Sequence, residues 1–83
     1  MVRKVPRYRF NVRHDDLLIR DSEGEELSDI EAAREEARNV LAEIARGGRL
    51  DPDFRVLAVE VIDDSDRHLF SVRMILEMGP TAR

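Results

Sequence analysis

Arginines on the first expected strand are the residues best placed to bind a charged partner. The segment Arg7–Arg13 alternates strictly between polar and apolar residues, which is typical of a half-buried β-strand. One side of this strand carries three arginines, Arg7, Arg9 and Arg13. Arg73, on the last expected strand, should lie nearby on the same sheet face. We expect these four arginines to form a binding surface for either a protein or phosphate groups.

Aromatic residues of the same strand help to decide between these two partners. A platform for single-stranded nucleic acid stacks bases on aromatic side chains that share a face with the basic residues. Tyr8 and Phe10 belong to the opposite side of the strand, which we expect to face the core. Only electrostatic contact with phosphate is then left, so nucleic acid is the less favoured partner.

Acidic residues gather in turns, where they could suggest a site for a divalent cation. Asp63, Asp64 and Asp66 share one expected turn, whereas the His14–Asp16 turn should lie at the other end of the sheet. Four further acids are expected near the first of these turns, Asp21, Glu23, Glu26 and Asp29. The D-x-D-x-D-G-x5-E spacing of an EF-hand loop is absent. Solvated turn acids are the simpler interpretation, so we expect no bound metal; a metal-dependent enzyme at this acidic end is the third hypothesis.

Residues for other kinds of catalysis are few. Cysteine is absent, which removes thiol nucleophiles, thiolate metal ligands and disulfides. His14 and His68 flank expected turns and have no serine partner at the spacing of a catalytic motif that we recognise. Gly47-Gly48 follows the expected helix instead of preceding one, so it is no phosphate-binding loop. We therefore expect no catalytic residues, no cofactor and no enzyme activity.

One long helix should organise the fold. Over Ser28–Arg46, apolar residues recur at helical spacing, at Ile30, Ala33, Ala37, Val40, Leu41 and Ile44. Ser28 and Glu31 have the spacing of a capping box, so we expect Ser28 to cap the start of the helix. At the other end, Gly47-Gly48 should adopt a left-handed conformation that ends it.

Strands are expected on both sides of this helix. Besides Arg7–Arg13, we predict strands over Leu17–Arg20, Phe54–Ile62 and His68–Leu76, and the polar segment Asp21–Glu26 as a connection. The order ββαββ indicates an α+β fold, a four-stranded antiparallel sheet with one helix packed on one face. A right-handed crossover favours the strand order 2-1-3-4, which places the strongly apolar third strand inside.

The length and the hydropathy of the chain indicate its domain organisation and its cellular location. The 83 residues are expected to form a single domain, 1–83, with an ordered core of about 5–77 and a C-terminal tail, 78–83. The longest mostly apolar run, Val56–Ile62, is too short to span a bilayer. The basic N-terminal segment is not followed by an apolar stretch, so we expect no signal peptide, no membrane contact and a cytoplasmic location.

Several short motifs resemble an uncharacterised family. They are Arg7-Tyr8-x-Phe10, Leu18-Ile19-x-Asp21-x-Glu23-Gly24-x-Glu26-Leu27-x-Asp29 and Ala33-x-x-Glu36-Ala37. The chain resembles a domain of unknown function of short alphaproteobacterial proteins over roughly residues 7–76. This resemblance implies the same order of elements and no particular activity. The chain differs from the family pattern at Ser28, where proline is common, and at Asp64-Ser65-Asp66, which replaces a turn containing glycine.

The sheet face opposite the helix is expected to combine arginines with apolar residues around Glu60. The apolar residues are Val56, Ala58, Ile62, Leu69 and Ile75. Such a mixture is typical of a protein interface, whereas Arg–Glu60 pairing on a merely solvated face is the alternative. We predict a non-catalytic interaction module that forms a homodimer through this face or an edge strand, or binds another protein. A nucleic-acid-associated regulatory protein using the basic first strand is the second hypothesis.

Overall fold

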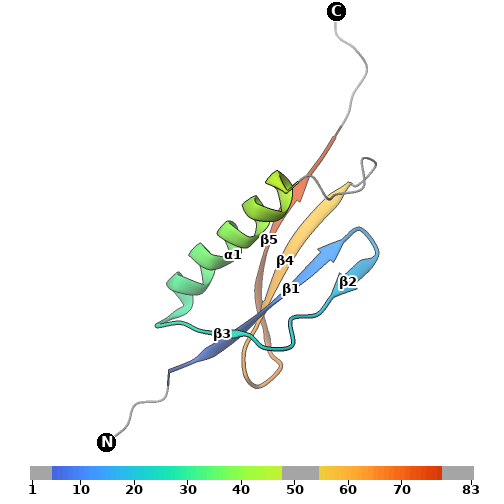
Figure 1. The fold of residues 1–83 in the computed structure, drawn as a ribbon. Helices are drawn as coiled ribbons and strands as arrows, with labels where there is room; N and C mark the ends of the chain where they lie inside the picture. The colour runs from blue at the N-terminus through green and yellow to red at the C-terminus, as the bar shows by residue number, and fades with distance from the viewer. Residues whose placement is uncertain (1–4, 48–54, 78–83) are drawn as a thin grey trace, which may run out of the picture.

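The order of the strands in the sheet differs from their order along the chain. The computed structural model describes residues 5–47 and 55–77. The elements are β1 (Arg7–His14), β2 (Leu17–Ile19), β3 (Glu25–Glu26), α1 (Ile30–Arg46), β4 (Val56–Ile62) and β5 (His68–Ile75) (Figure 1). The sheet has the order β2-β1-β4-β5, all neighbours are antiparallel, and β3 pairs with β1 outside this path. This confirms the α+β fold and the predicted strand order, with the apolar strand β4 inside the sheet.

The short strand β3 was expected to be part of a polar connection, and that prediction is wrong. Glu26 pairs with Arg7 and Glu25 pairs with Tyr8, both in antiparallel register. The strands β2 and β3 therefore occupy the same side of β1, one near each of its ends, and a loop connects them. The sheet consequently has five strands instead of four.

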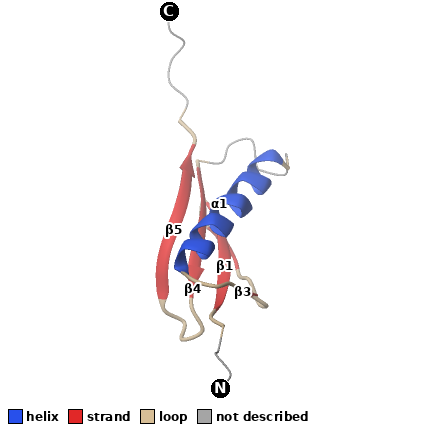
Figure 2. Cartoon of the chain, turned by 90° about the vertical axis from the view of Figure 1, so that its left-hand side faces the viewer, coloured by secondary structure: helices blue, strands red, loops and turns tan. Residues whose placement is uncertain are grey.

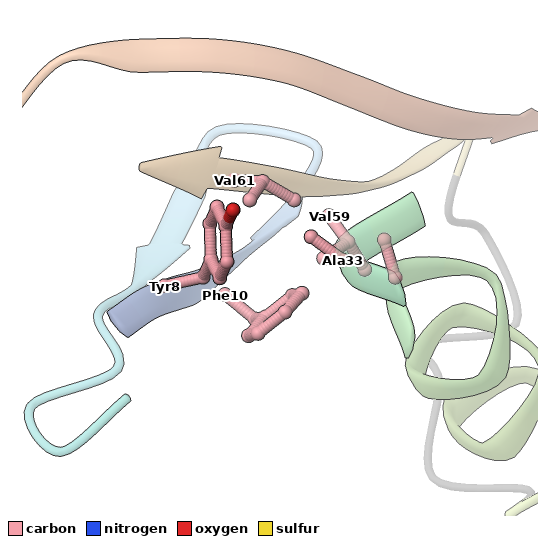
Figure 3. Packing of buried hydrophobic residues seen from close by; sticks show 6 residues of the cluster. Tyr8, Phe10, Ala33, Val59 and Val61 are labelled. Atoms are coloured by element: carbon pink, nitrogen blue, oxygen red, sulfur yellow. The ribbon is translucent and has the colours of Figure 1, made fainter. Parts of the chain in front are cut away.

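The helix α1 lies on one face of the sheet and contacts β4 and β5 (Figures 1 and 2). Two alanines, Ala33 and Ala37, are fully buried at this contact, as the helical spacing predicted. They belong to a cluster that also contains Tyr8, Phe10, Val59 and Val61, most of which are labelled in Figure 3. Ile30, which was expected on the same helix face, is 40% exposed because it is the first residue of the helix.

Both ends of α1 differ in detail from the prediction. Asp29, and not Ser28, is the N-cap: its carboxylate accepts a hydrogen bond from the Ala32 N–H at 2.9 Å. Aspartate is as good an N-cap residue as serine. With Asp29 as the N-cap, Ala32 is the third residue of the helix, and the N–H group at this position is one that an N-cap side chain commonly accepts from. At the other end, Gly47 has a φ of −67°, a right-handed conformation instead of the expected left-handed one. Its N–H still satisfies the carbonyl groups of Glu43 and Ile44.

A β-bulge changes the face of one residue that was assigned to the open side of the sheet. Ile62 pairs with His68 and Val61 pairs with Phe70, which leaves Leu69 unpaired between them. The extra residue breaks the two-residue alternation of side chains. Leu69 therefore packs against the buried cluster on the helix side, so its predicted place on the opposite face is wrong.

Some predicted features fall outside the part of the chain that the structure describes. They are Gly48 at the end of the helix, Phe54 at the start of the predicted third strand, and the C-terminal tail, 78–83. Over residues 5–47 and 55–77, no helix combines the length and the apolar character that crossing a membrane requires.

Candidate interaction surface

The sheet face turned away from α1 is the surface on which the predicted site residues lie. We call this surface the open face. Because side chains alternate along a strand, it consists of the residues between the helix-facing ones. The strand register places them in rows across the sheet: Arg9–Ile62–His68, Asn11–Glu60–Ser71, Leu18–Arg13–Ala58–Arg73 and Val56–Ile75. The predicted proximity of Arg73 to the arginines of β1 thus holds for Arg13, from which it is separated by one strand.

The arginines of β1 do not converge on one point, because each contacts a different acidic neighbour. The Arg7 guanidinium donates to the Glu23 carbonyl at 2.7 Å and lies 3.5 Å from the Glu26 carboxylate. Arg9 forms an ion pair with Asp66, in the turn between β4 and β5. Arg13 donates to Glu60 at 2.8 Å. The Arg–Glu60 pairing that the sequence offered as an alternative is therefore present on this face.

Arg73 has a different environment. It is exposed, and it forms no ion pair with any residue in 5–47 or 55–77. Its cross-strand neighbour Ala58 is only 3% exposed, although it lies on the open face, because Arg13 and Arg73 flank it on the adjacent strands. On the same face of β5, two residues further along, Ile75 is 57% exposed. This corner of the open face therefore combines an exposed cation, without an ion pair in the described part of the chain, with accessible apolar surface.

Asp21 holds the loop between β2 and β3 in place. Its carboxylate accepts hydrogen bonds from the backbone N–H groups of Phe10 at 3.0 Å, Glu23 at 3.2 Å and Gly24 at 3.1 Å. The Asp21 N–H donates to the buried side-chain oxygen of Asn11 at 2.9 Å. Asp21 thus replaces a strand partner for β1, a structural role instead of the metal-ligand role that was weighed for it.

Gly24 completes this arrangement at the start of β3. Its φ of +74° lies in the left-handed region, which side chains disfavour. A Cβ atom at this position would lie 2.8 Å from the carbonyl oxygen of Tyr8. Glycine therefore allows the chain to approach β1 closely enough for Glu25 and Glu26 to pair with it.

The two acidic turns lie at opposite ends of β4, as predicted. The Asp15 carboxylate accepts hydrogen bonds from the N–H groups of Arg55 at 3.0 Å and Val56 at 2.9 Å, where β4 begins. Asp63, directly after β4, accepts from the N–H groups of Ser65 and Arg67, each at 2.9 Å. Both carboxylates are thus used to fix the backbone of their turns.

Residues that match a family model span nearly all of this architecture. A model described as a domain of unknown function (DUF6894) covers residues 7–75, from the first residue of β1 to the last residue of β5. The chain belongs to this family. No curated protein and no solved structure matches the chain. The match confirms that the chain is a domain of unknown function, and the DUF6894 assignment indicates no particular activity.

Carboxylates in the described part of this DUF6894 domain do not assemble into a metal site. Among residues 5–47 and 55–77, no group of three or more histidine, cysteine or acidic side chains is arranged to hold a metal ion. At the acidic end of the sheet, Arg9 lies among the acids: it pairs with Asp66, and its charge lowers the pKa values of Asp21 and Asp63. A cation would have to compete with this arginine and with the backbone donors.

Hydrogen bonds to backbone N–H groups shift the pKa values of three aspartates in this DUF6894 domain. Partial burial raises the pKa of Asp21, but the hydrogen bonds from Phe10, Gly24 and Glu23 outweigh it, and the pKa lies below its ordinary value of 3.8. Hydrogen bonds from Val56 and Arg55 lower the pKa of Asp15, and those from Arg67 and Ser65 lower the pKa of Asp63. Burial and the charges of Glu25 and Glu43 instead raise the pKa of Glu36.

These shifts predict that the DUF6894 domain loses stability in acid. A carboxyl group with a lowered folded-state pKa stabilises the fold above its unfolded pKa, and this contribution is lost as the pH falls through the folded-state pKa. We expect the melting temperature to be nearly constant from about pH 7 to pH 5 and to fall steeply below about pH 4. Glu36, with a raised pKa, works weakly in the opposite direction. Thermal melts followed by circular dichroism test this, and an unchanged melting temperature down to about pH 3 would contradict it.

Proposed function

We propose that this domain is a non-catalytic interaction module that binds a second copy of itself through sheet surfaces that α1 leaves uncovered. The observation that carries the proposal is the corner of the open face on β5. There the exposed side chain of Ile75 lies beside Arg73, which has no ion pair within the described residues. Arginine next to accessible aliphatic surface is typical of protein interfaces. We place the module in the cytoplasm, as its sequence predicts.

Contact with nucleic acid has less support. Arg7, Arg9 and Arg13 each contact an acidic side chain of the same chain. A phosphate group would have to displace those carboxylates, and the aromatic residues of β1 are buried on the helix side, where they cannot stack on bases. Metal-dependent catalysis is disfavoured for a similar reason, because the best-placed carboxylates already accept backbone hydrogen bonds.

The mass in solution tests self-association. Light scattering should give twice the mass of the chain for the wild type, at low and at high salt, since an interface with apolar contacts is weakened little by screening. Arg73→Glu should shift the protein toward the monomer because it reverses the charge at this corner of the open face. Arg38→Glu is the matched control, since Arg38 is an exposed arginine of α1 that forms no ion pair within the described residues.

Two results would contradict the proposal. One is a wild-type protein that is monomeric at every concentration. The other is a dimer that dissociates as salt is added and re-forms on single-stranded RNA, since steep salt dependence is the mark of phosphate contact. The second result would favour the nucleic-acid hypothesis instead.

A further inference from the structure

We propose that the second copy docks on the edge strand β5, antiparallel to its own β5, with the two-fold axis beside Val72. This inference rests on the proposed self-association and specifies which surfaces meet. β5 has eight residues and pairs with β4 along one side. Figure 2 shows no described element beyond its outer edge. A long uncovered edge strand offers a row of backbone groups that another strand can pair with.

The opposite edge of the sheet is less suited to this role. It consists of two very short strands, β2 and β3, which are separated by the loop that Asp21 ties to β1. Short, interrupted edges are one of the ways in which sheets avoid pairing with other chains. The regular part of β5, from Phe70 to Ile75, has no such interruption.

Hydrogen bonds at the end of β5 show which of its backbone groups point outward. The Leu76 N–H donates to the Arg55 carbonyl at 2.9 Å, so the backbone groups of Leu76 point toward the neighbouring strand. The direction alternates along an antiparallel strand, so those of Val72 and Met74 also point inward. The backbone groups of Ser71, Arg73 and Ile75 therefore point away from the sheet and are available to a second strand.

Charge and strand length favour an axis beside Val72 over axes at Arg73, Met74 or Ile75. A two-fold axis at Arg73 would place two arginines directly opposite each other, which is destabilising. Axes at Met74 or Ile75 would leave the first half of β5 unpaired. An axis beside Val72 pairs Ser71 with Arg73 of the second copy, sets Val72 against Val72, and sets Phe70 against Met74.

This register also gives Arg73 a partner. Along one row of the open face, Arg73 of the second copy would follow Ser71, and Ser71 is the cross-strand neighbour of Glu60. Its Cα would lie roughly 10 Å from that of Glu60, twice the strand spacing, with only a serine side chain between them. Glu60 already accepts a hydrogen bond from Arg13 through one of its oxygens. Arg73 and the second oxygen of the Glu60 carboxylate, neither of which has an ion-pair partner among the described residues, therefore lie in one row across the interface.

Proline variants test whether the β5 edge carries the dimer. Ser71→Pro removes an outward N–H, which costs no hydrogen bond within the sheet. We expect Ser71→Pro to be monomeric, while Ser71→Ala, which keeps the N–H, stays dimeric. Leu18→Pro is the matched control at the other edge, because the Leu18 N–H also points outward there. Circular dichroism checks that each proline variant is folded.

Single-cysteine variants test the register without blocking the interface. The chain has no cysteine of its own, so each variant reports one position. Val72→Cys places two thiols across the two-fold axis at a distance suited to a disulfide, and we expect mild oxidation to convert most of it to a covalent dimer. Met74→Cys places its thiols several residues apart, so it should stay uncrosslinked.

The outcomes separate this inference from the proposed function. A folded Ser71→Pro variant that is still dimeric would overturn the β5 edge and leave self-association standing. A Met74→Cys variant that crosslinks in place of Val72→Cys would overturn the register. A wild-type monomer at every concentration would overturn both proposals.

Discussion

Replacing Asp21 with alanine is expected to lower the free energy of unfolding by about 2–3 kcal/mol, because it removes three hydrogen bonds, one to β1 and two within the loop between β2 and β3. The Asp21 carboxylate is the acceptor for the N–H groups of Phe10, Glu23 and Gly24. Phe10 is a buried residue of the cluster beneath α1, so its N–H would lose its acceptor at a site with little access to water. Such a loss is a large share of the stability of a domain of this size.

Asp64→Ala is the matched control for this prediction. Asp64 is also an aspartate in an exposed turn, but it forms no hydrogen bond or ion pair within the described residues. We expect its stability to stay within about 0.5 kcal/mol of the wild type. Urea unfolding measures both variants, and equal midpoints would show that the loop between β2 and β3 does not depend on Asp21.

Enlarging Ala37 to leucine is expected to have a comparable or larger effect. Ala37 is fully buried where α1 meets the sheet, in one cluster with Val59 and Val61. Extra methyl groups there would push the helix away from the sheet or force strained rotamers, at a cost of about 1–3 kcal/mol or more. Alanine and leucine are both good helix formers, so the change in stability would report packing and not helix propensity.

Ala42→Leu separates packing from any general effect of leucine on the helix. Ala42 is an exposed residue of the same helix, so leucine there meets water and not the sheet. Thermal melts of both variants make the comparison. If Ala37→Leu were as stable as Ala42→Leu, the close contact between α1 and β4 would be contradicted.

Local patterns were sufficient to predict most of the fold. The two-residue alternation of Arg7–Arg13, the helical spacing over Ser28–Arg46 and the two-sided apolar pattern of β4 each reflect burial on a defined face. Together with a right-handed crossover, they led to the observed strand order. The same alternation placed Tyr8 and Phe10 in the core, where they are buried.

Features that depend on one residue or on distant contacts were missed. β3 has only two residues, both glutamates, and it forms because Gly24 and Asp21 return the chain to β1. The bulge that turns Leu69 to the helix side lies beside the Asp63–Arg67 turn, where β4 and β5 join. Neither leaves a periodic signal in the sequence.

The candidate surface was predicted in outline and not in detail. Alternation placed the arginines on the open face, but their partners come from segments far away in the sequence, such as Asp66 for Arg9 and Glu60 for Arg13. Pattern alone could not show that Arg73 differs from the other three in having no ion pair within the described residues. The free edge of β5 follows from the strand order, which the sequence had already indicated.

Hydrogen exchange of the wild-type protein tests self-association through β5 most directly, because it needs no substitution. The backbone N–H groups of Ser71 and Arg73 point sideways from the β5 edge of the sheet, away from β4. The N–H group of Leu18 points outward in the same way at the opposite edge. We predict that exchange at Ser71 and Arg73 becomes slower as the protein concentration rises, while exchange at Leu18 does not change. Exchange at Ser71 and Arg73 that is as fast as at Leu18 at every concentration would contradict the account.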